Sequence, residues 1–228
     1  MARAVTLATL RSRVRQLAAC ENSEFPTDAE INGYLNDRIA SFWEEVVADG
    51  WGRGYFEIEG NVTITGGTTT YSLPADFYSL RLCEWRLDAT RRVRLLPWQL
   101  PEASYLRGAY SYAATYPSAY PSYRLRGGGT DGQTPQIEFQ PPPGSSGTVV
   151  LTYVPTPPAL TQDSHTIDGV CGWERWVVLM AAADVKLKEG DTAALADVVA
   201  LADRELARIR RSAPHRDSGA PMVVVDVY

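Results

Sequence analysis

The strongest constraint on the fold is a change of sequence pattern that occurs twice along the 228-residue chain. Near both ends, apolar residues recur three and four positions apart, which is the spacing of an amphipathic helix. Residues 54 to 160 instead contain frequent Gly and Pro, many β-branched and aromatic residues, and short alternating runs, which are typical of β-strands. The sequence therefore predicts helices on both sides of a β-rich region.

Two helices are predicted before the β-rich region. The first begins after the N-cap Thr6 and carries its apolar residues at Leu7, Leu10, Val14 and Leu17. At the start of the second, the Thr27 hydroxyl can cap the first turn while Glu30 reaches back to the Thr27 amide. The apolar stripe of this second helix contains Ile31, Leu35, Ile39, Phe42 and Val46, and Gly50 and Gly52 are expected to end it.

Two further helices follow the β-rich region. One contains Trp173 and Trp176, and the other contains Leu195 and Ile209 at helical spacing. Between them, Gly190 suits the end of one helix and Asp191 suits the N-cap of the next. So short a link predicts an antiparallel pair.

Eight strands are predicted in the β-rich region, with Gly- and Pro-rich turns between several of them. They are residues 55–59, 61–65, 70–73, 80–87, 93–96, 123–126, 136–140 and 148–154. Two packed small sheets or a small barrel would follow.

We therefore expect an α+β fold: an antiparallel bundle of about four helices with a large antiparallel β-rich insertion between helices two and three. The expected boundaries are 1–52 and 166–212 for the bundle and 53–165 for the insertion. Residues 213–228 are expected to form an extended C-terminal arm, because Pro214, Gly219 and Pro221 prevent a continuing helix.

The C-terminal arm ends in an apolar, strand-forming run. Left free, this run would present unpaired backbone groups and bare apolar surface. It either folds back as an edge strand of its own domain or adds as a strand to another subunit, and the second interpretation makes it a partner-binding segment. The residues concerned are Met222, Val223, Val224, Val225, Val227 and Tyr228.

Composition excludes several classes of protein. A net charge of −5 argues against a general nucleic-acid binder, which needs a dense basic surface. The three cysteines Cys20, Cys83 and Cys171 fit neither a disulfide framework nor a metal cluster, so reduced, partly buried thiols are expected. The sequence shows no signal peptide and no apolar run long enough to span a bilayer, which predicts a protein of the cytosol or of a particle assembled there.

Charge is unevenly distributed over the first two predicted helices. Residues 1 to 20 carry four arginines and no acid, whereas residues 21 to 50 carry eight acids against Arg38 alone. The two helices either compensate each other's charge, the interpretation we favour, or turn their faces to different neighbours.

No arrangement of residues predicts a catalytic, cofactor or metal site. His165 and His215 have no second ligand at metal spacing. Asp163, Ser164 and His165 contain the three residue types of a hydrolase triad, but adjacency in sequence is not triad geometry. The Gly-rich segment 126–132 has no Gly-Lys-Ser/Thr ending and no helix after it, so we interpret it as a hairpin loop.

The Tyr-rich run from Tyr105 to Tyr123 is the most unusual internal segment. Tyr rings over a sheet or a neighbouring subunit are the favoured interpretation. The alternative is a surface on which bases or sugars stack. A carbohydrate-binding β module of a surface protein would use Tyr110, Tyr112 and either Trp85 or Trp98 in this way.

The order of elements and several short sequence segments resemble the head-to-tail adaptor, or connector, proteins of tailed bacteriophages. The segment Tyr71–Tyr78 is similar to the Tyr-x-Leu-Pro-x-Asp-Phe motif of that family. The other similar segments cover its opening helix pair, its closing strands and its third helix, and they are residues 7–15, 25–36, 137–141, 150–155 and 173–179.

The resemblance implies a non-enzymatic virion protein of the neck, assembled in the host cytoplasm. It implies a homo-oligomeric ring of twelve copies beneath the portal protein, with the helices toward the portal and the β domain toward a tail, stopper or nozzle protein. DNA would pass through the ring during ejection without sequence-specific binding, and the C-terminal arm would dock on the portal or on a neighbouring subunit.

Overall fold

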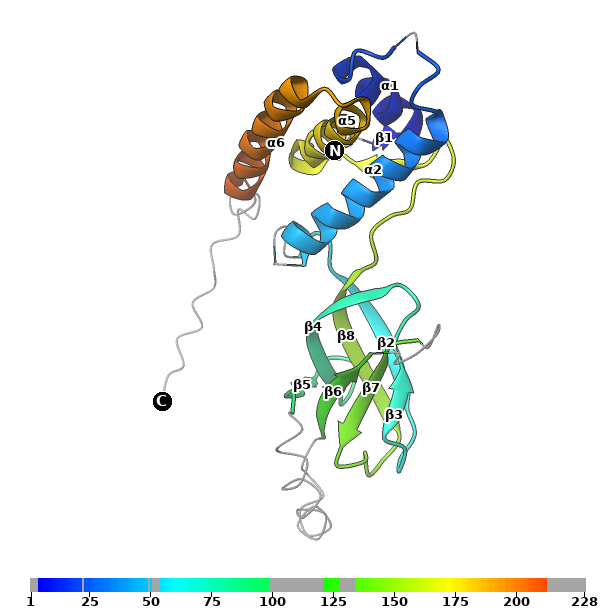
Figure 1. Ribbon diagram of the computed structural model, residues 1–228. Coiled ribbons are helices and arrows are strands. Elements are labelled where there is room, and N and C mark those ends of the chain that lie inside the picture. Colours follow the sequence, from blue (N-terminus) through cyan, green and yellow to red (C-terminus); the bar gives the residue numbers. More distant parts are fainter. Residues whose placement is uncertain are drawn as a thin grey trace. The chain divides into compact units, whose positions relative to one another are not determined.

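The computed structural model describes residues 4–21, 23–48, 50, 54–98, 121–127 and 134–212. The chain divides into two compact units (Figure 1). The helical unit comprises Met1–Arg53 and Pro157–Tyr228, and the β unit comprises Gly54–Thr156. Helices dominate the first unit and antiparallel sheets form the second, so the predicted α+β class is confirmed.

The first two helices begin where the sequence predicts. Helix α1 (Leu7–Leu17) starts after Thr6, whose Oγ1 accepts a hydrogen bond from the Thr9 amide at 3.2 Å. Helix α2 (Asp28–Phe42) starts with the predicted capping box between Thr27 and Glu30. It continues as a π-helix, η1 (Trp43–Val47), so helical structure ends before the glycine at position 50.

The last two helices are joined by a tight connection. Helix α5 (Trp173–Glu189) follows the short 3₁₀ segment η2 (Val170–Gly172) and ends at Gly190, which has a left-handed φ of 76°. Helix α6 (Thr192–Ser212) is capped by Asp191, whose Oδ1 accepts from the Ala194 amide at 3.1 Å. Both predicted caps are confirmed. Helix α5 packs against α1, α2 and α6 and thereby forms the centre of the helical unit.

A small two-stranded sheet in the helical unit was not predicted. Strand β1 (Ala4–Thr6) pairs antiparallel with β9 (Thr166–Asp168). Residues 157–165, which the sequence pattern assigned to the β-rich insertion, group with the helices. The reason is local: the Asn36 side chain donates to the Leu160 carbonyl at 3.0 Å and accepts from its amide at 2.8 Å.

The β unit consists of two antiparallel sheets, as expected. The four-stranded sheet has the order β2 (Ile58–Ile64), β8 (Gly147–Pro155), β4 (Phe77–Arg86) and β5 (Arg92–Arg94). The three-stranded sheet has the order β3 (Thr70–Ser72), β7 (Gln136–Gln140) and β6 (Ser122–Arg126).

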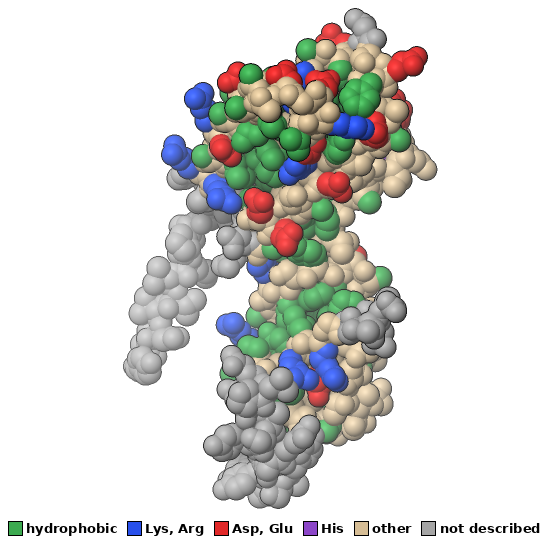
Figure 2. Space-filling model, viewed as in Figure 1, with side chains coloured by type: hydrophobic (Ala, Val, Ile, Leu, Met, Phe, Trp, Pro, Cys, Tyr) green, Lys and Arg blue, Asp and Glu red, His purple; other side chains and the backbone are tan. Residues whose placement is uncertain are grey.

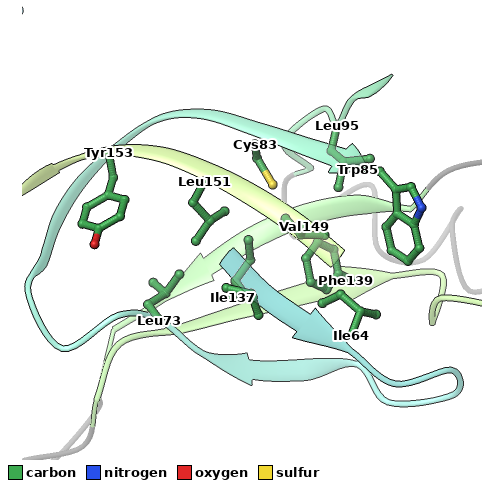
Figure 3. Close-up of a cluster of buried hydrophobic side chains, with 11 residues drawn as sticks. Ile64, Leu73, Cys83, Trp85, Leu95, Ile137, Phe139, Val149, Leu151 and Tyr153 are labelled. Carbon is green, nitrogen blue, oxygen red and sulfur yellow. The ribbon is translucent and has the colours of Figure 1, made fainter. Parts of the chain in front are cut away.

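The core of the β unit lies between these two sheets (Figure 3). Ile137 and Phe139 of β7 and Val149 and Leu151 of β8 are completely buried. Alternation along each strand accounts for the pattern, because residues two apart point to the same side of a sheet. The segment after β5 joins the sheets on one side, since the Trp98 amide donates to the Tyr123 carbonyl at 2.9 Å.

Two predicted strands are in fact one. We expected strands at 55–59 and 61–65 with Gly60 as a break, but β2 runs through this glycine. A Cβ at position 60 would lie 2.9 Å from Cε1 of Tyr153, so the neighbouring ring excludes a side chain there. Gly60 therefore marks a close approach of side chain to backbone, which is the other common role of glycine in a strand.

Candidate interaction surfaces

The predicted partner-binding residues belong to the C-terminal segment of the chain. Met222–Val225, Val227 and Tyr228 lie outside the described residues, which end at Ser212. Tyr110 and Tyr112 also lie outside them. His215 and residues 128–132 of the Gly-rich segment lie outside them as well.

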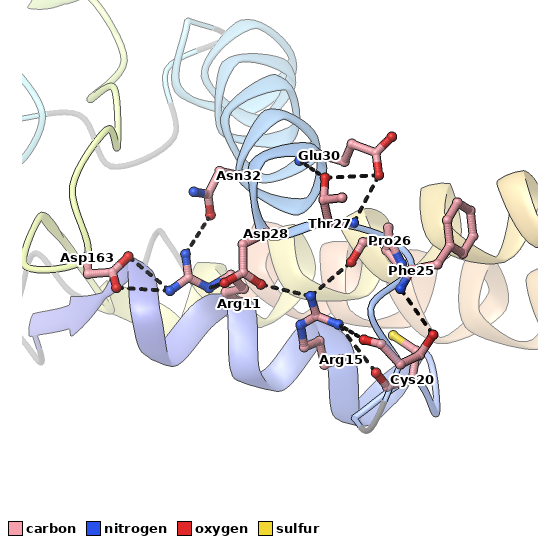
Figure 4. Close-up of polar contacts among 11 residues, drawn as sticks. Arg11, Arg15, Cys20, Phe25, Pro26, Thr27, Asp28, Glu30, Asn32 and Asp163 are labelled. Carbon is pink, nitrogen blue, oxygen red and sulfur yellow. Dashed lines mark hydrogen bonds and ion pairs between the residues drawn. The ribbon is translucent and has the colours of Figure 1, made fainter.

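Arg11 and Arg15 of α1 bind acids of the same unit (Figure 4). Arg11 Nη2 donates to both carboxylate oxygens of Asp163 at 3.0 Å, and Arg11 Nε lies 3.4 Å from Asp28 Oδ2. Arg15 Nη2 donates to Asp28 Oδ1 at 2.8 Å and to the Pro26 carbonyl at 2.9 Å. Mutual compensation between the first two helices is therefore confirmed for Arg11, Arg15 and Asp28, and Asp28 is the only acid of α2 that an ion pair joins to α1 among the described residues.

These contacts of Arg11 and Arg15 hold neighbouring segments of the helical unit together. They fix the connection between α1 and α2, and through Asp163 they also fix the segment that leads into β9. Both guanidinium groups are mostly buried, with exposed side-chain fractions of 15% for Arg11 and 17% for Arg15. Their hydrogen-bonding capacity serves the protein itself, so this basic cluster is not a binding site for an external anion.

The Asp163–Ser164–His165 segment does not form a hydrolase triad. A triad needs the aspartate to accept a hydrogen bond from the imidazole and orient it. Here the Asp163 carboxylate binds Arg11, and His165 Nδ1 accepts from the Thr161 amide at 3.2 Å. The geometry gives this segment a structural role at the start of β9.

The two tryptophans of the carbohydrate-binding alternative are also unsuited to that role. Trp85 and Trp98 have exposed fractions of only 8% and 5%. The Arg124 guanidinium lies 4.7 Å from the centre of the Trp98 ring and donates to Glu138 at 2.8 Å. A sugar-stacking platform needs a bare aromatic face, which neither indole offers.

The outer face of the four-stranded sheet is covered by charged side chains. Arg92 binds the Glu59 carboxylate through two contacts of 2.6 and 3.2 Å. Glu84 stands opposite Val150, and Val150 is only 1% exposed although it points away from the core between the sheets. The hydrogen bond from Arg92 lowers the pKa of Glu59. Long side chains thus shield this face and keep its apolar residues from water.

Exposed apolar side chains occur at one end of the helical unit. Leu17 is the last residue of α1, Phe25 lies in the connection to α2, and Leu187 lies near the end of α5, with exposed fractions of 45%, 43% and 64%. Lys188 Nζ lies 4.8 Å from the centre of the Phe25 ring and forms an ion pair with Glu30. Exposed apolar residues rimmed by charges are typical of protein contacts.

The described residues offer no group of three or more metal-ligating side chains. Cys20, Cys83 and Cys171 are free thiols and are buried, rather than partly buried as expected. Within the same described ranges, no helix is long and apolar enough to cross a membrane.

Comparison with known families identifies the protein class. The model of the SU10 adaptor protein family matches residues 5–225, which is nearly the whole chain. No curated protein matches this sequence. The match includes both units and extends into the predicted C-terminal arm. The chain therefore belongs to the SU10 adaptor protein family and is a structural adaptor of a bacteriophage.

Proposed function

We propose that the protein forms the head-to-tail adaptor ring of a tailed phage, with an expected twelve copies seated beneath the portal. The observation that carries this proposal is the family match over residues 5–225. The ring would link the portal to a tail, stopper or nozzle protein in the virion neck, after assembly in the host cytoplasm. Its role is structural, and the protein has no reaction to perform.

The two units suit two different partners. The helical unit would face the portal, and the β unit would face the tail. Each unit has its own buried core and its own exposed apolar residues. Those of the β unit include Tyr55, Ile58 and Leu96, with exposed fractions of 50%, 41% and 61%.

The C-terminal arm would add a tether to this assembly. Residues 222–228 are proposed to pair as a strand with the portal or with the next subunit, because a Val-rich segment beyond a Pro- and Gly-containing linker can form main-chain hydrogen bonds in an acceptor sheet. Such an arm adds affinity without a large rigid surface.

DNA would pass through the ring without being read. A net charge of −5 provides no general attraction for the phosphate backbone. This suits a conduit, since a channel that bound DNA tightly would slow its ejection.

Electron microscopy of the full chain mixed with the portal protein of its own phage tests the proposal. We expect portal particles that carry one added ring, with the helical unit against the portal and the β unit away from it. Portal particles that remain bare at excess chain, while the chain itself is folded by circular dichroism, would contradict the proposal.

A further inference from the structure

Helices α2 and α6 each have a face with no packing partner among the described residues of the helical unit. In Figure 1, helix α5 lies between α6 on one side and the pair α1 and α2 on the other. Helix α6 uses Ala202 and Ile209 as its fully buried contacts, and α2 uses Ile31, Leu35, Ile39 and Phe42. The faces opposite to these residues therefore point outward on opposite sides of the unit.

The outer face of α6 carries two small residues and two arginines. Ala200, Arg204, Ala207 and Arg211 follow one another at helical spacing, and all four are exposed. Neither arginine has an ion pair within the described part of the chain. Arg208 differs, since it donates to the Cys171 carbonyl at 2.9 Å and to Glu205 at 2.7 Å. Figure 2 shows basic side chains gathered along this side of the helical unit.

The outer face of α2 carries the complementary set. Gly33, Asp37, Ala40 and Glu44 are all exposed, and Glu44 lies in the π-helical continuation η1. Neither carboxylate has an ion pair with any described residue. An added Cβ at Gly33 would meet nothing within 4 Å, so the space outside α2 is open at this point.

The two sets match in order and in spacing. Each steps by four, three and four residues, from Gly33 to Glu44 and from Ala200 to Arg211. Laid side by side in the same direction, the helices place Gly33 by Ala200, Asp37 by Arg204, Ala40 by Ala207 and Glu44 by Arg211. Small residues then meet small residues, and each acid meets an arginine.

We propose that α6 of one chain packs in parallel on α2 of the next chain, through Ala200, Arg204, Ala207 and Arg211 against Gly33, Asp37, Ala40 and Glu44. This inference rests on the proposed ring and specifies the contact between neighbours. Small residues at the crossing let the helix axes approach to about 8 Å, which brings the four charged side chains into reach of one another.

The geometry of the helical unit favours a head-to-tail contact. Two different faces on opposite sides of one chain form a heterologous interface, which closes into a ring when the rotation between neighbours permits. In Figure 1, α2 and α6 run in the same sense through the unit, so a small rotation between neighbours keeps them parallel. Charge opposes the two-fold alternatives, because α6 on α6 would bring arginines together and α2 on α2 would bring carboxylates together.

Charge reversal tests the contact. The variant D37R/E44R has basic outer faces on both α2 and α6, and the variant R204E/R211E has acidic ones. Each should assemble on the portal at least ~tenfold more weakly than the unmodified chain. An equal mixture of the two variants should restore rings, because every interface then joins an acidic face to a basic one in alternating order. The charge-conserving variant D37E/E44D is the matched control and should assemble normally.

The outcomes separate the two proposals. If the unmodified chain forms no ring on the portal, the proposed function fails. If it forms rings and both reversal variants do so equally well, or the mixture does not recover assembly, the contact between α2 and α6 is wrong. Misfolding of a variant cannot imitate the expected result, since two misfolded chains would not rescue each other.

Cysteine cross-linking gives an independent measurement. In a chain carrying A40C and A207C, a short bifunctional thiol reagent should produce a ladder of covalent oligomers, while either single variant should not extend beyond a dimer. The three natural thiols are buried and therefore do not compete. If cross-linking of portal-bound rings of the double variant gives no ladder of covalent oligomers, the proposed contact is wrong.

Discussion

A single methyl group added at Gly147 should disturb the packing of the β unit. An added Cβ would lie 2.6 Å from Cζ2 of Trp85, an indole that is 8% exposed. Gly147→Ala should therefore lower the free energy of unfolding by about 1–3 kcal/mol, measured by chemical denaturation. Gly144→Ala is the matched control, since nothing lies within 4 Å of its added Cβ. Equal denaturation midpoints for the two variants would contradict this packing.

Cys83 should couple the stability of the β unit to alkaline pH. Burial raises the pKa of its thiol from 9.0 to about 12. Between these values the unfolded chain loses the proton and the folded chain keeps it, so this thiol's contribution to stability is lost as the pH rises above 9. In Cys83→Ala, the denaturation midpoint should fall less steeply between pH 8 and 11. The cavity that the substitution leaves should lower the midpoint by a similar amount at every pH. An unchanged slope would show that other groups cause the dependence.

Residues whose role depends on near neighbours in sequence were predicted correctly. Thr6, Thr27, Gly190 and Asp191 act within one helical turn, so their spacing alone identified them as caps. The roles of Gly60 and Gly147 depend on rings that belong to other strands, and no local pattern carries that information. The same limit applies to Asp163, whose partner Arg11 is distant in sequence.

Two helix glycines should respond in opposite ways to the same substitution. Gly33 lies inside α2 with open space around it, so Gly33→Ala should raise the free energy of unfolding by about 0.5–1 kcal/mol through helix propensity. Gly190 has a φ of 76° at the end of α5, so Gly190→Ala should lower the free energy of unfolding by about 1 kcal/mol. Thermal melting followed at 222 nm measures both. A shift in the same direction for the two variants would contradict these assignments.

The longer elements follow from the sequence better than the short ones. The helical spacing of α1, α2, α5 and α6 repeats over several turns, and most residues that it assigns to the apolar faces are buried or half-buried, with Leu17 at the end of α1 as an exception. Strands β1 and β9 have three residues each, too few to show alternation, and they pair across most of the chain. The sides of the proposed contact, α2 and α6, were recognised as helices, but their outer faces could be assigned only after α5 was seen to lie between them.

The β unit should fold without the rest of the molecule. Its two ends meet, because β2 and β8 are antiparallel neighbours with Ile58 opposite Tyr153. It also has a buried core of its own. Residues 54–156 expressed alone should give a β-type circular dichroism spectrum and a cooperative denaturation curve. Leu151→Ala should lower the midpoint by a similar amount in the fragment and in the full chain, since Leu151 is completely buried in this core. A fragment without cooperative unfolding would show that the helical unit is needed for folding.

The arm should matter for assembly and not for folding. Helix α6 ends at Ser212, and the helices before that point bury Phe42, Trp173 and Ile209 almost completely. Deletion of residues 213–228 should therefore leave the melting temperature nearly unchanged but abolish or weaken incorporation into portal-bound rings, counted by electron microscopy. As a control, replacing Val223 and Val225 by Lys in the full-length chain should weaken incorporation in the same way, because it keeps the length of the arm and removes its apolar strand character. A strongly lowered melting temperature after the deletion would instead show that the arm pairs with a sheet of its own subunit. The proposal that the arm tethers the chain to the portal or to the next subunit would then be wrong.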